Sequence, residues 1–149
     1  MGSTFNVTLD DSSPMFSYLP YGDGPVDEGW RAWYSQIGFN NDCGKESVGD
    51  SLHITSSAGA SVQLTFSGTA VYLFGTANSS YEVSLDTRTT SFPPPLDNLL
   101  FSAVGLLPGT HYVNLTANPQ TGQQLAFDRA IISDQTPQGC DHVRLAAKR

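Results

Sequence analysis

Basic residues are scarce in this sequence. Seven of its 149 residues are Lys or Arg, against 14 Asp and Glu, which gives a formal net charge of -7. Three of these seven, Arg144, Lys148 and Arg149, stand at the extreme C-terminus. Nucleic-acid phosphates are bound by clustered Lys and Arg, so we expect no nucleic-acid partner. The same scarcity argues against an anionic membrane surface as a partner.

Long apolar runs are also lacking. No stretch approaches the roughly 18 apolar residues of a membrane-spanning helix, and no charged and then apolar signal segment opens the chain. We therefore expect no membrane insertion by this chain. Residues 1–3 read as a cloning remnant and residues 142–149 as a tail or linker, which leaves residues 4–141 as the domain. With 39% hydrophobic residues, the chain is long enough for one core and too short for two.

Cysteine occurs only twice, as Cys43 and Cys140. Neither lies in a CxxC or CxxH pattern, so zinc is not expected. A disulfide between them would close a loop of roughly 100 residues and stabilise the fold by about 4 to 5 kcal/mol in the chain-entropy model; two separate thiols are the alternative. Glycosylation sequons at Asn6, Asn78 and Asn114 add to the case for an extracellular glycoprotein.

The dominant pattern of the second half is a period of two. Residues 60–67 (ASVQLTFS) alternate apolar and polar side chains without a fault, which is typical of a half-buried strand. The predicted inward-facing residues are Val62, Leu64, Phe66, Val83, Leu85, Val113 and Leu115, with Gln63 and Thr65 on the outside.

Short strands punctuated by Gly, Pro and Asn continue along the chain, and no segment has the caps and period of a helix. Ser67-Gly68 is expected to be the tight turn of a hairpin. The proline-rich stretch 87–98 is expected to be a surface crossover, because proline cannot donate to a sheet. The pattern predicts an all-β, antiparallel β-sandwich of jelly-roll type. Its roughly eight strands are residues 5–9, 51–55, 60–67, 69–75, 81–86, 99–104, 111–117 and 124–132.

Residues 10–50 show no strong period, and loops of that length are usually functional or disordered. Seven aromatic residues between positions 16 and 39 argue against disorder. This segment must therefore pack on the rest of the domain.

Several stretches resemble one known group of proteins. FNVTLDDSSPMFSYLPYGDG, SLHITSSAGASVQLTFSGTAVYLFGTANSSYEVSLD and LFSAVGLLPGTHYVNLTA are similar to extracellular domains of single-pass membrane or secreted proteins of basidiomycete fungi. The match runs from Phe5 to Ser133, and GTAVYLFG and SYEVSLD are its most specific parts. The resemblance implies a galactose-binding-like β-sandwich, an extracellular location and a carbohydrate-related role, the last by analogy between folds.

An aromatic platform is the first candidate site. The apolar face of a sugar ring stacks on indole or phenol rings, while its hydroxyls seek polar partners. Trp33 and Tyr34, beside Arg31, would serve, and Tyr21 lies in the same aromatic segment. The alternative is that the tryptophans plug one end of the sandwich: the resemblance favours the core for Trp30, and for Trp33 both positions stay open.

The charged pair Asp128-Arg129 is the second candidate, because it interrupts an apolar strand and a buried charge needs a partner. One interpretation is a pair satisfied within the structure. The other places Arg129 on a concave face with Gln63 and Thr65, where it would donate to sugar hydroxyls.

Catalysis and metal binding have weaker support. A glycoside hydrolase needs two facing carboxyls, and the candidates are Asp10, Asp11, Asp23, Asp27, Glu28 and Asp128. Asp10 and Asp11 are expected to end a strand in an Asx-turn instead. No GxSxG motif occurs, and His53, His111 and His142 lie in strand or tail contexts that indicate ordinary imidazoles.

No cofactor is expected. Structural calcium stays open through Asn40-Asn41-Asp42 or through Asp23 and Asp27, although no EF-hand spacing is present.

The sequence therefore predicts an extracellular, non-catalytic ligand-binding module, with a glycan as the partner. The alternative is a glycoside hydrolase acting on cell walls, and the third interpretation is a structural or adhesion module. The identity of the sugar, self-association into a homo-oligomer and a membrane anchor beyond this chain stay open.

Overall fold

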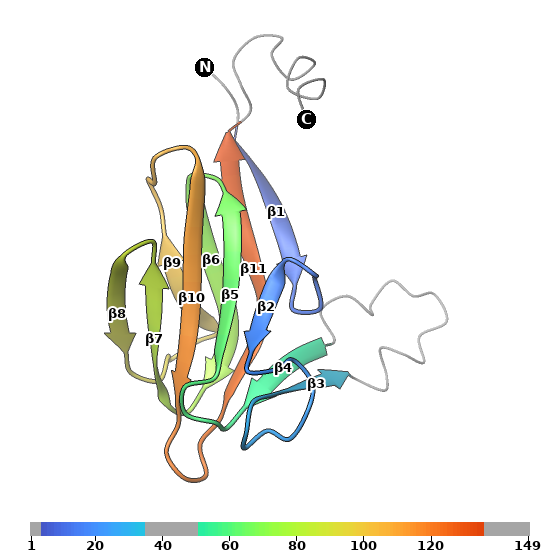
Figure 1. The fold of residues 1–149 in the computed structure, drawn as a ribbon. Coiled ribbons are helices and arrows are strands. Elements are labelled where there is room, and N and C mark those ends of the chain that lie inside the picture. Colours follow the sequence, from blue (N-terminus) through green and yellow to red (C-terminus); the bar gives the residue numbers. More distant parts are fainter. Residues whose placement is uncertain (1–3, 35–50, 136–149) are drawn as a thin grey trace.

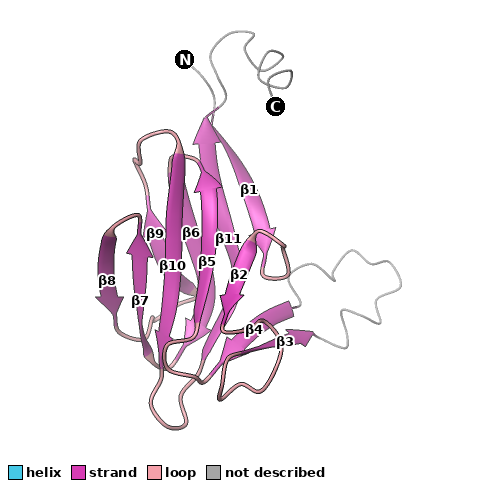
Figure 2. Cartoon of the chain, viewed as in Figure 1, coloured by secondary structure: helices cyan, strands magenta, loops and turns pink. Residues whose placement is uncertain are grey.

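The computed structural model describes residues 4–34 and 51–135. These residues form eleven strands and no helix, in two antiparallel sheets packed face to face (Figures 1 and 2). The predicted all-β sandwich is confirmed, with more strands than the expected eight. No helix in the described ranges is long and apolar enough to cross a membrane. The strands are β1 (Thr4–Asp10), β2 (Phe16–Leu19), β3 (Trp30–Tyr34), β4 (Ser51–Thr55), β5 (Ser61–Ser67), β6 (Ala70–Ala77), β7 (Ser80–Leu85), β8 (Arg88–Phe92), β9 (Leu99–Ala103), β10 (Thr110–Asn118) and β11 (Leu125–Gln135).

The six-stranded sheet has the order β3-β4-β11-β6-β9, and β1 also pairs with β11. The five-stranded sheet has the order β2-β5-β10-β7-β8. Strands β5 and β6 are consecutive in sequence but belong to different sheets, so the predicted hairpin at Ser67-Gly68 is wrong. The chain crosses between the sheets there: the Gly68 N–H donates to the Gly109 carbonyl, and the Thr69 N–H donates to the Ser133 carbonyl. A Cβ atom on Gly68 would lie 2.5 Å from the Ser133 carbonyl oxygen, so this crossing requires glycine.

Three strands were not expected from the sequence. β2 and β3 lie in the segment without a clear period, and β8 lies in the stretch predicted to be a crossover. β8 is an edge strand that pairs with β7 alone. The prediction that this stretch forms no central strand therefore holds, and the prolines follow the strand.

The core lies between the two sheets and confirms the predicted register. Six of the seven residues expected inside are buried, whereas Leu85 is only partly buried. Gln63 and Thr65 are exposed as predicted. Trp30 is completely buried, and its Nε1–H donates to the Ser61 carbonyl at 2.9 Å.

Strand β11 changes partner along one of its edges. Its other edge pairs with β6 from Leu125 to Ser133, with a register shift between Phe127 and Arg129. The edge opposite β6 pairs first with β4, through residues 125–127 of β11, and then with β1, through residues 129–135 of β11. The ends of β1 and β4 therefore face each other along β11, on either side of Asp128. Figure 1 shows both strands beside β11.

Candidate functional site

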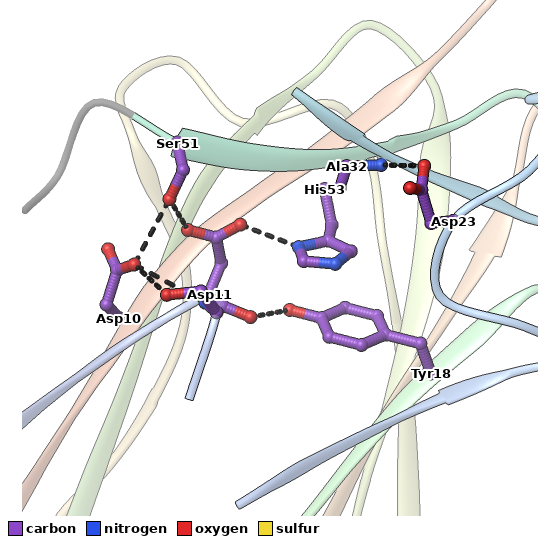
Figure 3. A network of polar contacts seen from close by, with 8 residues as sticks. Asp10, Asp11, Tyr18, Asp23, Ala32, Ser51 and His53 are labelled. Atoms are coloured by element: carbon purple, nitrogen blue, oxygen red, sulfur yellow. Dashed lines mark hydrogen bonds and ion pairs between the residues drawn. The ribbon is translucent and has the colours of Figure 1, made fainter. Parts of the chain in front are cut away.

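A buried polar network occupies the junction of β1 and β4 (Figure 3). Asp11 follows the last residue of β1, and its N–H donates to the Asp128 carbonyl at 2.9 Å. The Asp11 carboxylate is 1% exposed and accepts from the Ser51 hydroxyl at 2.5 Å. Its other oxygen lies 2.6 Å from His53 Nδ1. Ser51 and His53 both belong to β4, so Asp11 ties the end of β1 to this neighbouring strand.

Tyr18, on β2 of the other sheet, completes this network. Its hydroxyl donates to the Asp11 carbonyl at 2.6 Å. Its ring stacks on His53 with the centroids 3.8 Å apart and an interplanar angle of 9°, and the Trp30 ring meets Tyr18 edge-on at 5.4 Å. The network therefore joins both sheets and is an internal anchor of the sandwich.

Asp10 and Asp128 flank Asp11 and differ in their electrostatics. Burial disfavours ionisation of Asp10, but hydrogen bonds from Ser12 and Ser51 outweigh it and lower the pKa of this carboxyl. The predicted Asx-turn is formed by Asp10, whose carboxylate accepts from the Ser12 N–H at 3.4 Å and also from the Ser12 hydroxyl at 2.7 Å. Burial raises the pKa of Asp128, against the opposing effect of the adjacent Arg129.

These three carboxyls could hold a hard cation. Asp10, Asp11 and Asp128 each offer an oxygen, and these oxygens all lie within 4.8 Å of one another. One oxygen of Asp10 and one of Asp128 are buried without a hydrogen-bond partner among the described residues. Oxygen ligands of this kind suit Ca²⁺, although Arg129 already offsets part of the negative charge.

The calcium ligands expected from the sequence lie elsewhere. Asp23 is exposed, and its carboxylate accepts from the Ala32 N–H at 3.2 Å (Figure 3). Asp27 and Glu28 are also exposed. Asn40-Asn41-Asp42 lies outside the described residues.

The outer face of the six-stranded sheet carries a second candidate site. Side chains alternate along β3, so Trp30 points into the core while Arg31 and Trp33 point outward. Trp33 is 45% exposed and pairs in register with Leu52. Arg31 is exposed and pairs with Ile54. The indole therefore stands next to the outward-facing apolar residues of β4.

A hollow of about 460 Å³ lies on this face. Trp33 does not line it, but pairs in register with Leu52, which does. Its apolar lining includes Leu52, Ile54 and Ala126, which belong to β4 and β11. The polar residues that line it are Thr76, Asn78 and Gln124, all exposed. The Asn78 side-chain carbonyl accepts from the Gln124 N–H at 2.8 Å, which fixes this polar side. We call this site, together with Trp33 and Arg31, the outer hollow.

Strand β4 explains how the anchor and the outer hollow arise together. Its polar residues Ser51, His53 and Thr55 are buried, whereas the apolar Leu52 and Ile54 between them are only partly buried. This reverses the usual arrangement of a half-buried strand. In the sequence, residues 51–55 (SLHIT) alternate polar and apolar side chains, with polar residues at both ends. This alternation is the signal that could have indicated buried polar residues in β4.

The predicted ligand-binding residues do not form a single site. Trp33 and Arg129 share the outer face of the six-stranded sheet, where Arg129 lies over the Phe74 ring at 4.4 Å and contacts Asp128 at 2.8 Å. Gln63 and Thr65 belong to the other sheet, so the prediction that they share a face with Arg129 is wrong.

Tyr21 and Tyr34 have different positions. The Tyr21 hydroxyl donates to the Pro25 carbonyl at 2.6 Å. Its ring fills the space beside Gly24 and Gly29, where a Cβ atom would approach it to 2.5 and 2.8 Å. Tyr21 therefore shapes its own loop. Tyr34 ends β3, and its side chain lies outside the described part.

The predicted sequons lie in different settings. Asn6 and Asn78 are exposed, whereas Asn114 is partly buried on β10 and donates to the Thr116 hydroxyl at 3.2 Å. Cys43, Cys140 and His142 lie outside the described residues, so the disulfide stays a prediction. His53 and His111 are each paired with a carboxylate.

Comparisons with known proteins identify the fold only. No protein-family model matches the chain, and no curated protein matches its sequence. A family two carbohydrate esterase from Cellvibrio japonicus has 14% identity and a TM-score of 0.59 over 92% of this chain and 36% of its own. A two-domain esterase active on acetylated mannans has 12% identity and a TM-score of 0.58 over 90% of this chain and 37% of its own. The chain spans about a third of the length of these two structures.

Proposed function

We propose that this protein is an extracellular, non-catalytic carbohydrate-binding domain, and that the outer hollow is its sugar site. The observation that carries the proposal is the half-exposed indole of Trp33 beside an apolar floor with polar residues on its far side. An indole and an apolar floor suit the C–H face of a pyranose, and the polar residues suit its hydroxyls.

Two further points support a carbohydrate ligand. Of the two proteins with a similar fold, one is a carbohydrate esterase and the other is an esterase active on acetylated mannans. The volume of the outer hollow, about 460 Å³, lies in the range of pockets that hold small ligands.

The arrangement of the acids favours binding over hydrolysis. A glycoside hydrolase needs two carboxyls that face each other across the scissile bond, about 5 Å or about 6.5 to 9.5 Å apart. Asp11 is buried and engaged by Ser51 and His53, and Asp128 is paired with Arg129. Asp10 accepts from the Ser12 and Ser51 hydroxyls, so all three clustered carboxyls already bind neighbouring side chains.

Calorimetric titration with manno-, xylo- and gluco-oligosaccharides tests the proposal. Trp33→Ala should weaken binding of the best ligand by about 1 to 3 kcal/mol, as expected for the loss of an aromatic anchor. The matched control is Tyr112→Ala, since Tyr112 is 60% exposed on the other sheet. Binding that survives in Trp33→Ala and is lost in Tyr112→Ala would place the site on the five-stranded sheet. Release of reducing ends during the titration would support the hydrolase instead.

A further inference from the structure

The two sheets stay apart along part of one side of the sandwich. Strand β8 ends the five-stranded sheet and β9 ends the six-stranded sheet, and the two strands do not pair with each other. Between them lies a slot of about 480 Å³. Its lining includes Leu85 from β7, Phe101 and Ala103 from β9, and Leu106 from the following loop. We call it the edge slot; it shares no residue with the outer hollow.

The apolar residues of the edge slot are incompletely covered. Leu85, Phe101, Ala103 and Leu106 pack against the core but are only partly buried. Leu85 is the one residue of the predicted inward set that is not fully buried. Further along the same side the sheets do meet, since the rings of Phe92 and Phe101 lie 5.9 Å apart. The edge slot is therefore the part of this side where the core still has room for an apolar group.

The lining of the edge slot includes a cation that has no partner among the described residues. Arg88 lines the slot and is exposed, and its guanidinium has no hydrogen-bond or ion-pair partner among the described residues. The other charged lining residue, Asp86, is already engaged: one oxygen accepts from the Tyr112 N–H at 2.9 Å, and the other lies 2.8 Å from His111 Nδ1. Arg88 is thus the charge that is available to a ligand.

We propose that the edge slot binds an amphiphile with a carboxylate head and an unbranched apolar tail, that is, a fatty acid. The tail lies against Leu85, Phe101, Ala103 and Leu106 and removes their remaining apolar surface from water. The carboxylate lies against Arg88, whose planar guanidinium matches a carboxylate with two parallel hydrogen bonds.

The test uses the whole protein, labelled with ¹⁵N, and decanoate below its micelle concentration. Decanoate should shift the amide resonances of β7, β8 and β9 and leave those of β3 and β4 unchanged. Decanol, which has the same tail without the charge, should bind about fivefold more weakly, which corresponds to an exposed ion pair of about 1 kcal/mol. Arg88→Gln should remove this difference between decanoate and decanol.

Two size variants locate the ligand. Ala103→Phe places a ring in the edge slot and should abolish the binding of both probes. The matched control is Ala126→Phe, which fills the outer hollow and should leave the binding of decanoate unchanged. An unchanged spectrum elsewhere shows that each variant is folded. The proposal is overturned if decanoate shifts no resonance of the edge slot, if Ala103→Phe binds it as the wild type does, or if Arg88→Gln keeps the preference for the charged probe.

Discussion

Replacing Trp30 by alanine tests the assignment of the two tryptophans most sharply. Trp30 is 0% exposed, whereas Trp33, three residues later, is 45% exposed. Truncation of a buried tryptophan costs about 3 to 5 kcal/mol through the lost burial and the cavity. The Ser61 carbonyl also loses the indole N–H that lies 2.9 Å away, which adds about 1 kcal/mol. We expect Trp30→Ala to lower the free energy of unfolding by about 4 to 6 kcal/mol.

Urea denaturation, followed by circular dichroism, measures this loss as a lower urea concentration at the unfolding midpoint with an unchanged m-value. The free energy of unfolding of a native domain is about 5 to 15 kcal/mol. The loss expected for Trp30→Ala could therefore remove most of the stability of the fold. Trp30→Phe keeps most of the ring and loses the hydrogen bond, and should cost about 1 to 3 kcal/mol. Trp33→Ala should change the stability by less than about 0.5 kcal/mol. Equal losses in Trp30→Ala and Trp33→Ala would refute the placement of Trp30 inside and Trp33 outside.

Three further predictions concern ionisable groups. Asp11→Ala should destabilise the protein by about 3 kcal/mol or more in the same urea assay, because Ser51 and His53 lose a buried partner; a loss below about 1 kcal/mol would contradict the anchoring role. The hydrogen bond between Asp86 and His111 lowers the pKa of the carboxyl from 3.8 and raises the pKa of the imidazole from 6.5. The stability contributed by Asp86 is therefore lost as pH falls through its lowered pKa, and that contributed by His111 is lost as pH rises through its raised pKa. The stability difference between wild type and His111→Gln should therefore be largest between about pH 4 and 6.5 and shrink on either side, and a difference independent of pH in thermal melts would rule out this linkage. If the acidic cluster holds a hard cation, Ca²⁺ should raise the melting temperature of the wild type but not of Asp128→Asn, and an equal response of both to Ca²⁺ and EDTA would exclude Asp128 as a ligand.

Most of the sandwich could be predicted from periodicity, but its connections could not. Alternating burial identifies β5 because one of its faces lies on the core and the other in water. Strand β8 has exposed residues at four of its five positions, so it carries no alternation that would reveal it. The Ser67-Gly68 dipeptide marks a reversal of the chain, and a dipeptide does not tell whether the next strand joins the same sheet or the opposite one.

The candidate sites depend on contacts between residues that are distant in sequence. The sequence predicts an Asx-turn for Asp10-Asp11, and the structure shows one at Asp10. Asp11 contacts His53, 42 positions later, and no local pattern contains that pairing. Trp33 was singled out by its residue type alone, whereas its apolar neighbours become visible only when β4 is placed beside β3.

The pairing of β1 with β11 determines how the domain responds to mechanical force. Thr4 pairs with Gln135, and Asp10 with Arg129, so both ends of the described sandwich leave from the same pole (Figure 1). Tension applied to these two ends pulls two neighbouring antiparallel strands apart from one end and breaks their hydrogen bonds one after another. The seven paired positions therefore never bear the load together, and β1 peels away at low force. The outer hollow belongs to strands that this first step leaves in place.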